Sequence, residues 1–147
     1  QKLNMEKKAF TKELLKIAYA ATVCDGDIDE SELEVIQALE KEDFYLKEED
    51  LSDVLKNYEK DAADDLLEFA NKAVKETYTL DLTPAEKMIL VNLAIAIVRA
   101  DGKMQEQEIS FVKSLILNLQ LPEELVTAAN GNWWVIQSKS NLNTSKE

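Results

Sequence analysis

Apolar side chains recur along this chain every three or four residues, the spacing that places them on one face of a helix. In residues 5–23 the apolar positions on that face are Phe10, Leu14, Ile17, Ala18 and Ala21. The same spacing predicts further helices at about 30–42, 51–58, 66–74, 84–98, 106–119 and from about residue 123 to 130. No segment has the alternating pattern of a half-buried strand. The chain is therefore predicted to be all-α, with about seven helices.

The clearest helix start is the segment Thr83-Pro84-Ala85-Glu86. Its residue types fit an N-cap threonine, a proline in the first turn and a glutamate that closes a capping box. The helix that follows contains the longest apolar run of the chain, from Met88 to Val98. This run is too short to cross a bilayer, so it predicts a buried helix and no membrane insertion.

The length of 147 residues suits one domain with its own core, and three glycines and two prolines leave few turns between long elements. We expect a single compact domain over residues 1–136. The polar residues 137–147 are expected to form a frayed tail. Just before that tail, the apolar segment Trp133-Trp134-Val135-Ile136 is expected to return and cover a groove.

An Asp-Gly pair followed by a glutamate occurs twice, as Asp25 to Glu32 and as Asp101 to Glu108. The offset between the copies is 101 − 25 = 76 residues, and the apolar positions on both sides keep the same offset. Each copy ends one predicted helix and begins another, which indicates a duplicated helix–loop–helix unit. We expect the halves to pack as a pseudo-twofold pair. Both loops would then lie close together at one end, with Ile28 facing Met104.

The charge of the chain is strongly negative and unevenly distributed. The net charge is −12 at pH 7, and residues 25–68 hold 18 acidic residues against four lysines. Such a field attracts cations and basic protein surfaces and repels nucleic acid and anionic lipid. The predicted partners are therefore cations or basic protein surfaces. The alternative is an acidic surface whose only effect is solubility.

The second half of each Asp-Gly copy matches the second half of an EF-hand calcium loop. In the first copy Asp25, Asp29 and Glu32 take ligand positions, and in the second copy Asp101 and Glu108 do so. The first half of the EF-hand loop is missing from both copies, because helix residues stand at those positions. The pattern predicts a weak site for a hard divalent cation, calcium or magnesium, rather than a full EF-hand.

The same residues also have a purely structural interpretation. Asp29 with Glu32 fits a capping box, and Glu108 with the residue three positions before it fits a weaker one. Capping leaves Asp25 and Asp101 unexplained, because each follows the C-terminal end of a helix, where the dipole disfavours an acid. From the residues alone, metal binding and loop structure both stay open.

Some chemistry is excluded by what the sequence lacks. There is no histidine and only one cysteine, Cys24, which excludes an intrachain disulfide, the usual zinc sites and a Ser–His or Cys–His nucleophile pair. Cys24 fits a small buried side chain at the end of an apolar helix. We therefore predict that the protein is not an enzyme. The alternatives are a metal-dependent hydrolase that uses carboxylates and a carrier protein modified at Ser31.

The segment from Val98 to Gly102, with Glu108 beyond it, resembles the signature of the tellurite-resistance TerB family, whose fold is shared by membrane-anchored co-chaperone domains. The resemblance covers roughly residues 10–130. It implies a compact helical domain in the bacterial cytoplasm, connected with stress or tellurite resistance. It also implies that the loop acids are candidate metal ligands, namely Asp25, Glu32, Asp101 and Glu108. The first copy departs from the signature, because Cys24 stands where the second copy has alanine.

Together these features predict a non-enzymatic, acidic helical module of the cytoplasm that resembles stress-response and tellurite-resistance proteins. It is expected to bind a divalent cation weakly at the Asp-Gly loops and to contact other proteins. The alternatives are a structural or protein-interaction domain without metal, and the carboxylate hydrolase.

Overall fold

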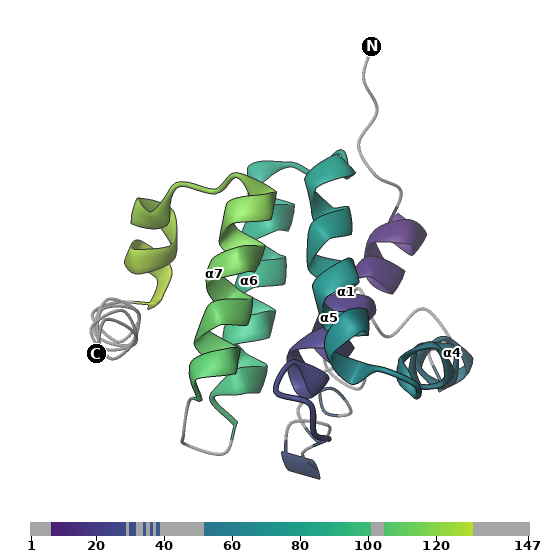
Figure 1. Cartoon of the computed structure of the whole chain (residues 1–147). Coiled ribbons are helices and arrows are strands. Elements are labelled where there is room, and N and C mark those ends of the chain that lie inside the picture. Colours follow the sequence, from purple (N-terminus) through teal and green to yellow (C-terminus); the bar gives the residue numbers. More distant parts are fainter. Residues whose placement is uncertain are drawn as a thin grey trace.

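The computed structural model describes residues 7–28, 30, 31, 34, 36, 38, 52–100 and 105–130, and every element in that part of the chain is helical (Figure 1). The elements are α1 (Lys7–Val23), α4 (Ser52–Ala62), α5 (Leu66–Glu76), the short 3₁₀ helix η1 (Thr77–Thr79), α6 (Pro84–Val98) and α7 (Glu106–Leu119). Residues 30, 31, 34, 36 and 38 and residues 123–130 are also helical. The all-α prediction is confirmed, and each predicted helical segment contains helical residues.

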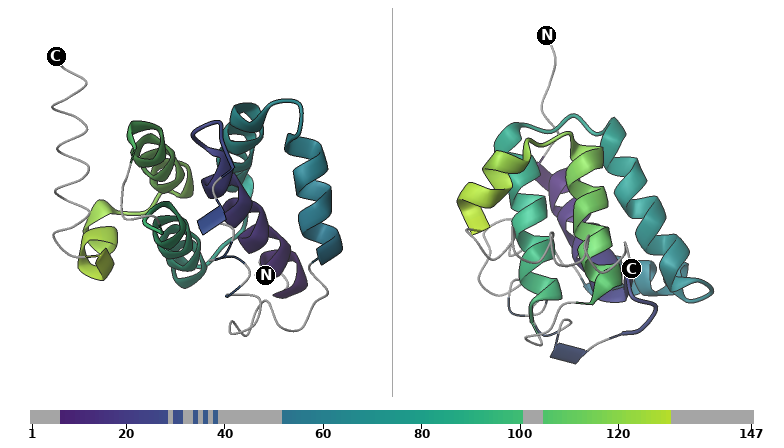
Figure 2. Two further views of the ribbon diagram at one scale, coloured as in Figure 1. Left: turned by 90° about the horizontal axis from the view of Figure 1, so that it is seen from below. Right: turned by 60° about the vertical axis from the view of Figure 1, so that its left-hand side comes forward.

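The helices form one packed group around α1. This helix contacts α4, α5 and α6, while α7 packs against α5 and α6. In Figures 1 and 2, α4 lies at one edge of the group and the helix of residues 123–130 at the other. Phe69 of α5 joins three of the helices, because its ring lies 5.6 Å from Tyr19 of α1 and 6.1 Å from Tyr58 of α4, centroid to centroid. Such aromatic contacts add to the apolar area that the helices bury.

Helix α1 and the second half of α6 are buried on most sides. For α6 this was predicted, and its residues from Leu90 to Val98 are buried except Asn92 and Ala96. For α1 the sequence predicts a single apolar face, yet residues on other sides of the helix are fully buried as well; they are Leu15, Ala20 and Val23. The reason is that α1 contacts three helices at once. Among the described helices, none is long and apolar enough to cross a membrane.

Capping residues fix where the helices begin. Thr83 Oγ1 accepts a hydrogen bond from the Glu86 N–H (3.1 Å), and the Glu86 carboxylate accepts one from the Thr83 N–H (2.9 Å). The predicted capping box of α6 is therefore confirmed. Asp65 caps α5 in a similar way, since its Oδ1 accepts from the Glu68 N–H at 3.0 Å. The sequence interpretation had not assigned this cap.

The apolar periodicity of residues 66–74 includes Leu67 among the positions expected to be buried. In the structure Leu67 is 48% exposed and lines a cleft between α5 and α7. The segment Trp133-Trp134-Val135-Ile136 and the tail 137–147 lie outside the described residues, so their predicted roles stay predictions.

Candidate functional site

The first Asp-Gly loop begins at the end of α1 with a tight turn. Gly26 has a φ of +88°, and its N–H donates to the Val23 carbonyl at 2.9 Å. A φ in this range is readily adopted by glycine and strained for most other residues. The Asp25 carboxylate closes the turn, because its Oδ1 accepts the Asp27 N–H at 3.0 Å. Asp25 therefore has a structural role, an Asx-type turn, that the sequence interpretation did not assign to it.

The second Asp-Gly loop is described only from residue 105 onward, where α7 begins. Glu108 is 3% exposed, and its carboxylate accepts the Gln105 N–H at 2.8 Å. This is the glutamate half of the capping box predicted for this helix. Glu108 is thus held in place by the start of α7, with or without a cation.

The predicted metal ligands fall into two groups. Asp25 and Glu108 are described, and each accepts a backbone hydrogen bond. Asp29, Glu32 and Asp101 lie outside the described residues. Within the described part of the chain, no three carboxylate or thiol side chains are grouped as a metal site requires. A carboxylate has two oxygens, so the turn bond of Asp25 alone is compatible with a metal at its other oxygen.

The helix ends that flank the two loops lie at the same end of the molecule. The C-terminal end of α1, the C-terminal end of α6 and the start of α7 are together at the lower end of Figure 1. Cys24 and Glu106 line one cleft of about 430 Å³ between α5 and α7, so the loop after α1 reaches the start of α7. Ile28 is 52% exposed, and its predicted partner Met104 lies outside the described residues.

A second cleft, of about 470 Å³, lies between α1, α4 and α5 and is lined mainly by acidic side chains. Its lining residues are Lys16, Tyr58, Asp61, Asp64, Asp65, Glu68, Phe69, Lys72, Ala73 and Glu76. The five acids outnumber the two lysines. The sequence predicts an acidic region here from its charge excess, but not that helices from distant segments shape it into a cleft.

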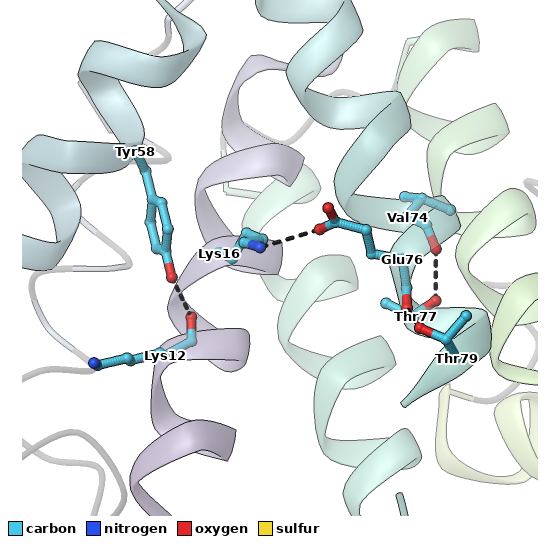
Figure 3. A network of polar contacts seen from close by, with 7 residues as sticks. All are labelled: Lys12, Lys16, Tyr58, Val74, Glu76, Thr77 and Thr79. Atoms are coloured by element: carbon cyan, nitrogen blue, oxygen red, sulfur yellow. Dashed lines mark hydrogen bonds and ion pairs between the residues drawn. The ribbon is translucent and has the colours of Figure 1, made fainter. Parts of the chain in front are cut away.

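Polar contacts across this acidic cleft join the three helices (Figure 3). Lys16 Nζ of α1 pairs with Glu76 Oε1 of α5 at 3.1 Å. Tyr58 of α4 donates its hydroxyl to the Lys12 carbonyl of α1 at 2.9 Å. The Lys16 ammonium also lies 5.9 Å from the centroid of the Tyr58 ring, within the range of a cation–π contact.

Glu13 of α1 lies buried beside these groups. It is 7% exposed, and burial raises its pKa from 4.5 to about 7, with Lys16 opposing the shift and Glu76 adding to it. The pKa of Tyr58 rises to about 12, mainly through burial and also through the charges of Glu13, Asp61 and Glu76. The sequence interpretation missed Glu13. The available signal was its spacing from Phe10 and Ile17, which puts it on the apolar side of its helix.

Comparison with protein families agrees with this architecture. The family model described as tellurite resistance protein TerB matches residues 7–130, from the start of α1 to the end of the last described helix. Comparison with curated proteins and with solved structures gave no significant match. The family match covers most of the chain, both Asp-Gly loops included. The chain belongs to the TerB family of tellurite resistance proteins.

Proposed function

We propose that this chain is a non-enzymatic binding module of the cytoplasm whose acidic side contacts cationic partners. The observation that carries the proposal is the acidic cleft between α1, α4 and α5, where five carboxylates face two lysines. A concave surface of one charge sign concentrates ligands of the opposite sign. Basic protein segments and divalent cations are therefore the partner classes that fit.

A basic protein segment suits the cleft for a second reason. Asp61, Asp64 and Glu68 are exposed and available for ion pairs, while Tyr58 and Phe69 offer aromatic surface to the apolar stems of lysine or arginine. Exposed ion pairs of this kind are individually weak and are screened by salt. Binding should accordingly be reversible and salt-sensitive.

Divalent cations are proposed to bind weakly at the Asp-Gly loops, through Asp25, Asp29, Glu32, Asp101 and Glu108. Carboxylates are hard oxygen donors, and the sequence contains no imidazole, so calcium or magnesium is preferred over zinc. Half of the EF-hand ligand positions lack oxygen side chains, which suggests a Kd on the order of 10⁻⁵ to 10⁻³ M for calcium. No observation favours the hydrolase or carrier alternatives.

Titration calorimetry with two kinds of ligand tests the proposal. Calcium, magnesium and zinc probe the loops, and a lysine-rich peptide probes the cleft. The loop variant is Asp25→Asn with Asp101→Asn, and the cleft variant is Asp61→Asn with Asp64→Asn. The control is Glu123→Gln with Glu124→Gln, two exposed acids of the helix of residues 123–130. Each of the three double variants removes two negative charges. A difference between them therefore reports the loss of a local contact and not the change in net charge.

We expect the loop variant to lose the heat of calcium binding and the cleft variant to bind the peptide several-fold more weakly at low salt. The control should change both signals only slightly. If the cleft variant and the control weaken peptide binding equally, the cleft is not the contact surface. If millimolar calcium gives no heat with the wild type, the loops have a structural role alone.

A further inference from the structure

Glu13 is a buried acid for which the packing gives no structural role. Its Oε2 is buried and accepts no hydrogen bond from a described residue. Glu108, the other buried acid of the described residues, differs in that its carboxylate accepts the Gln105 N–H of a helix start. A buried carboxylate oxygen without a hydrogen bond destabilises a fold, so the presence of Glu13 at a helix junction needs another explanation.

The titratable groups near Glu13 come from three helices. Lys16 lies one turn along α1, Tyr58 comes from α4, Glu76 comes from α5, and Asp61 of α4 adds its charge at Tyr58. Lys16 is the nearby cation, and its ammonium already pairs with Glu76 at 3.1 Å. One ammonium thus serves two carboxyl groups, so the fold favours the neutral form of Glu13. Its pKa of about 7 agrees with this geometry.

Of the helices that surround Glu13, α4 has the smallest buried surface. Ala62 is the only buried residue among its described side chains. Tyr58 links α4 to both neighbouring helices. Its hydroxyl donates to the Lys12 carbonyl of α1, and its ring contacts Phe69 of α5. Elements with few buried contacts open at the lowest free-energy cost. Water can therefore reach an ionised Glu13 most cheaply by movement of α4.

We propose that Glu13 is a proton-operated latch: α4 closes over α1 and α5 while the carboxyl is protonated, and opens to admit water when the carboxyl ionises. Because α4 supplies Tyr58 and Asp61 to the acidic cleft, the same proton controls the shape of that cleft. The latch rests on the packing around Glu13 and does not depend on cation or peptide binding. The chain has no histidine, so few other groups titrate between pH 6 and 8.

Amide hydrogen exchange across α4 tests the latch in the full-length protein. Protection factors, corrected for the intrinsic pH dependence of exchange, are measured at pH 6 and pH 8 for the wild type and for Glu13→Gln. With a pKa that falls from about 7 in the closed state to 4.5 in an open, hydrated state, protection of α4 should drop about tenfold between these pH values. In Glu13→Gln it should stay constant, because the amide cannot ionise.

The matched control is Glu68→Gln, which changes an exposed carboxyl of the same cleft to an amide and should retain the wild-type drop. Protection of α6 and α7, which are expected to exchange through global unfolding, should exceed that of α4 at both pH values in the wild type, because α4 opens on its own at a lower free-energy cost. Carboxyl carbon NMR of Glu13 supplies an independent readout, with a midpoint expected near neutral pH.

Three results would overturn the latch. One is a Glu13 midpoint near 4.5, and another is an equal drop in Glu13→Gln. The third is constant α4 protection while Glu13 titrates near neutrality. In that case the Lys16 ammonium turns to the ionised Glu13 carboxylate, and α4 does not move.

Discussion

At the scale of single residues, Glu13 makes the stability of this fold depend on pH. Burial raises its pKa from 4.5 to about 7 in the folded protein. The folded state therefore binds this proton more tightly than the unfolded chain does. As the pH rises from about 4.5 towards 7, the unfolded chain loses the proton first, and the free energy of unfolding decreases. The stabilisation is fully present below 4.5 and is lost once the pH passes about 7.

We expect Glu13→Gln to abolish this decrease. Relative to the wild type, the variant should gain about 2 kcal/mol in the free energy of unfolding between pH 5.5 and pH 8. Urea denaturation at the two pH values measures the gain. The difference between the two pH values cancels any pH-independent cost of burying an amide in place of a carboxyl group. A stability difference that is the same at both pH values would contradict the assignment.

Residues whose role depends on their neighbours in sequence could be predicted, and those whose role depends on packing could not. Thr83, Glu86 and Glu108 cap helices through bonds to residues three positions away, a spacing that is visible in the sequence. Glu13 is unusual because the packing of α4 and α5 against α1 buries it and brings the charge of Glu76 beside it. The sequence shows the acid but not these distant neighbours.

At the scale of elements, the bounds of α6 and α7 follow from local signals. Pro84 and Glu106 begin these helices where the capping pattern places them. The burial of α1 on most sides was not predicted, because it depends on how many helices contact it. Periodicity identifies an apolar face, but only the packed structure decides whether the other faces are covered as well.

The capping role of Glu108 predicts how substitutions there will affect α7. Glu108→Ala removes the acceptor of the Gln105 N–H and should lower the free energy of unfolding by roughly 0.5–2 kcal/mol. Glu108→Gln should keep most of the stability, because its amide oxygen can accept the same bond. Thermal and urea denaturation in the presence of a chelator separate this effect from any effect of metal. The same test applies to Glu32, which lies outside the described residues.

Glu106→Ala is the control, since Glu106 is an exposed acid of the same first turn. It loses only a favourable interaction with the helix dipole, worth a few tenths of a kcal/mol. If Glu108→Ala costs no more than this control, the cap does not contribute to stability. If Glu108→Gln is as unstable as Glu108→Ala in chelator, the negative charge rather than the hydrogen bond is what α7 requires.

At the scale of the whole molecule, the helix order and the TerB-family fold could be predicted, because the duplicated motif and the helical period extend over most of the chain. The contacts between helices that are distant in sequence could not be predicted. The acidic cleft combines α1 with α4 and α5, and the cleft between α5 and α7 brings Cys24 to the start of α7. Both depend on side chains far apart in sequence, which a periodic pattern does not place relative to one another.

The duplication leads to a prediction about the two loops. The ends of α1 and α6 lie at the same end of the molecule, and Cys24 shares a cleft with Glu106. A pseudo-twofold pairing of the halves would bring Ile28 close to Met104, with the loop acids in one cluster. In a Cys24→Ser background, Ile28→Cys with Met104→Cys should then form an intramolecular disulfide under mild oxidation, because a disulfide requires Cα atoms about 4.4–6.8 Å apart.

Intact mass and a non-reducing gel detect this crosslink, and circular dichroism checks that the helices are retained. The control pairs Ile28→Cys with Leu125→Cys in the same background. Leu125 is also exposed, but it belongs to the helix of residues 123–130, which follows α7 at the end opposite the loops. Crosslinking of both pairs to the same extent would indicate random collisions. If the Ile28 and Met104 variant stays reduced while its fold is intact, the loops do not pair. Each would then be an independent half-loop, with fewer carboxylates available to a single cation.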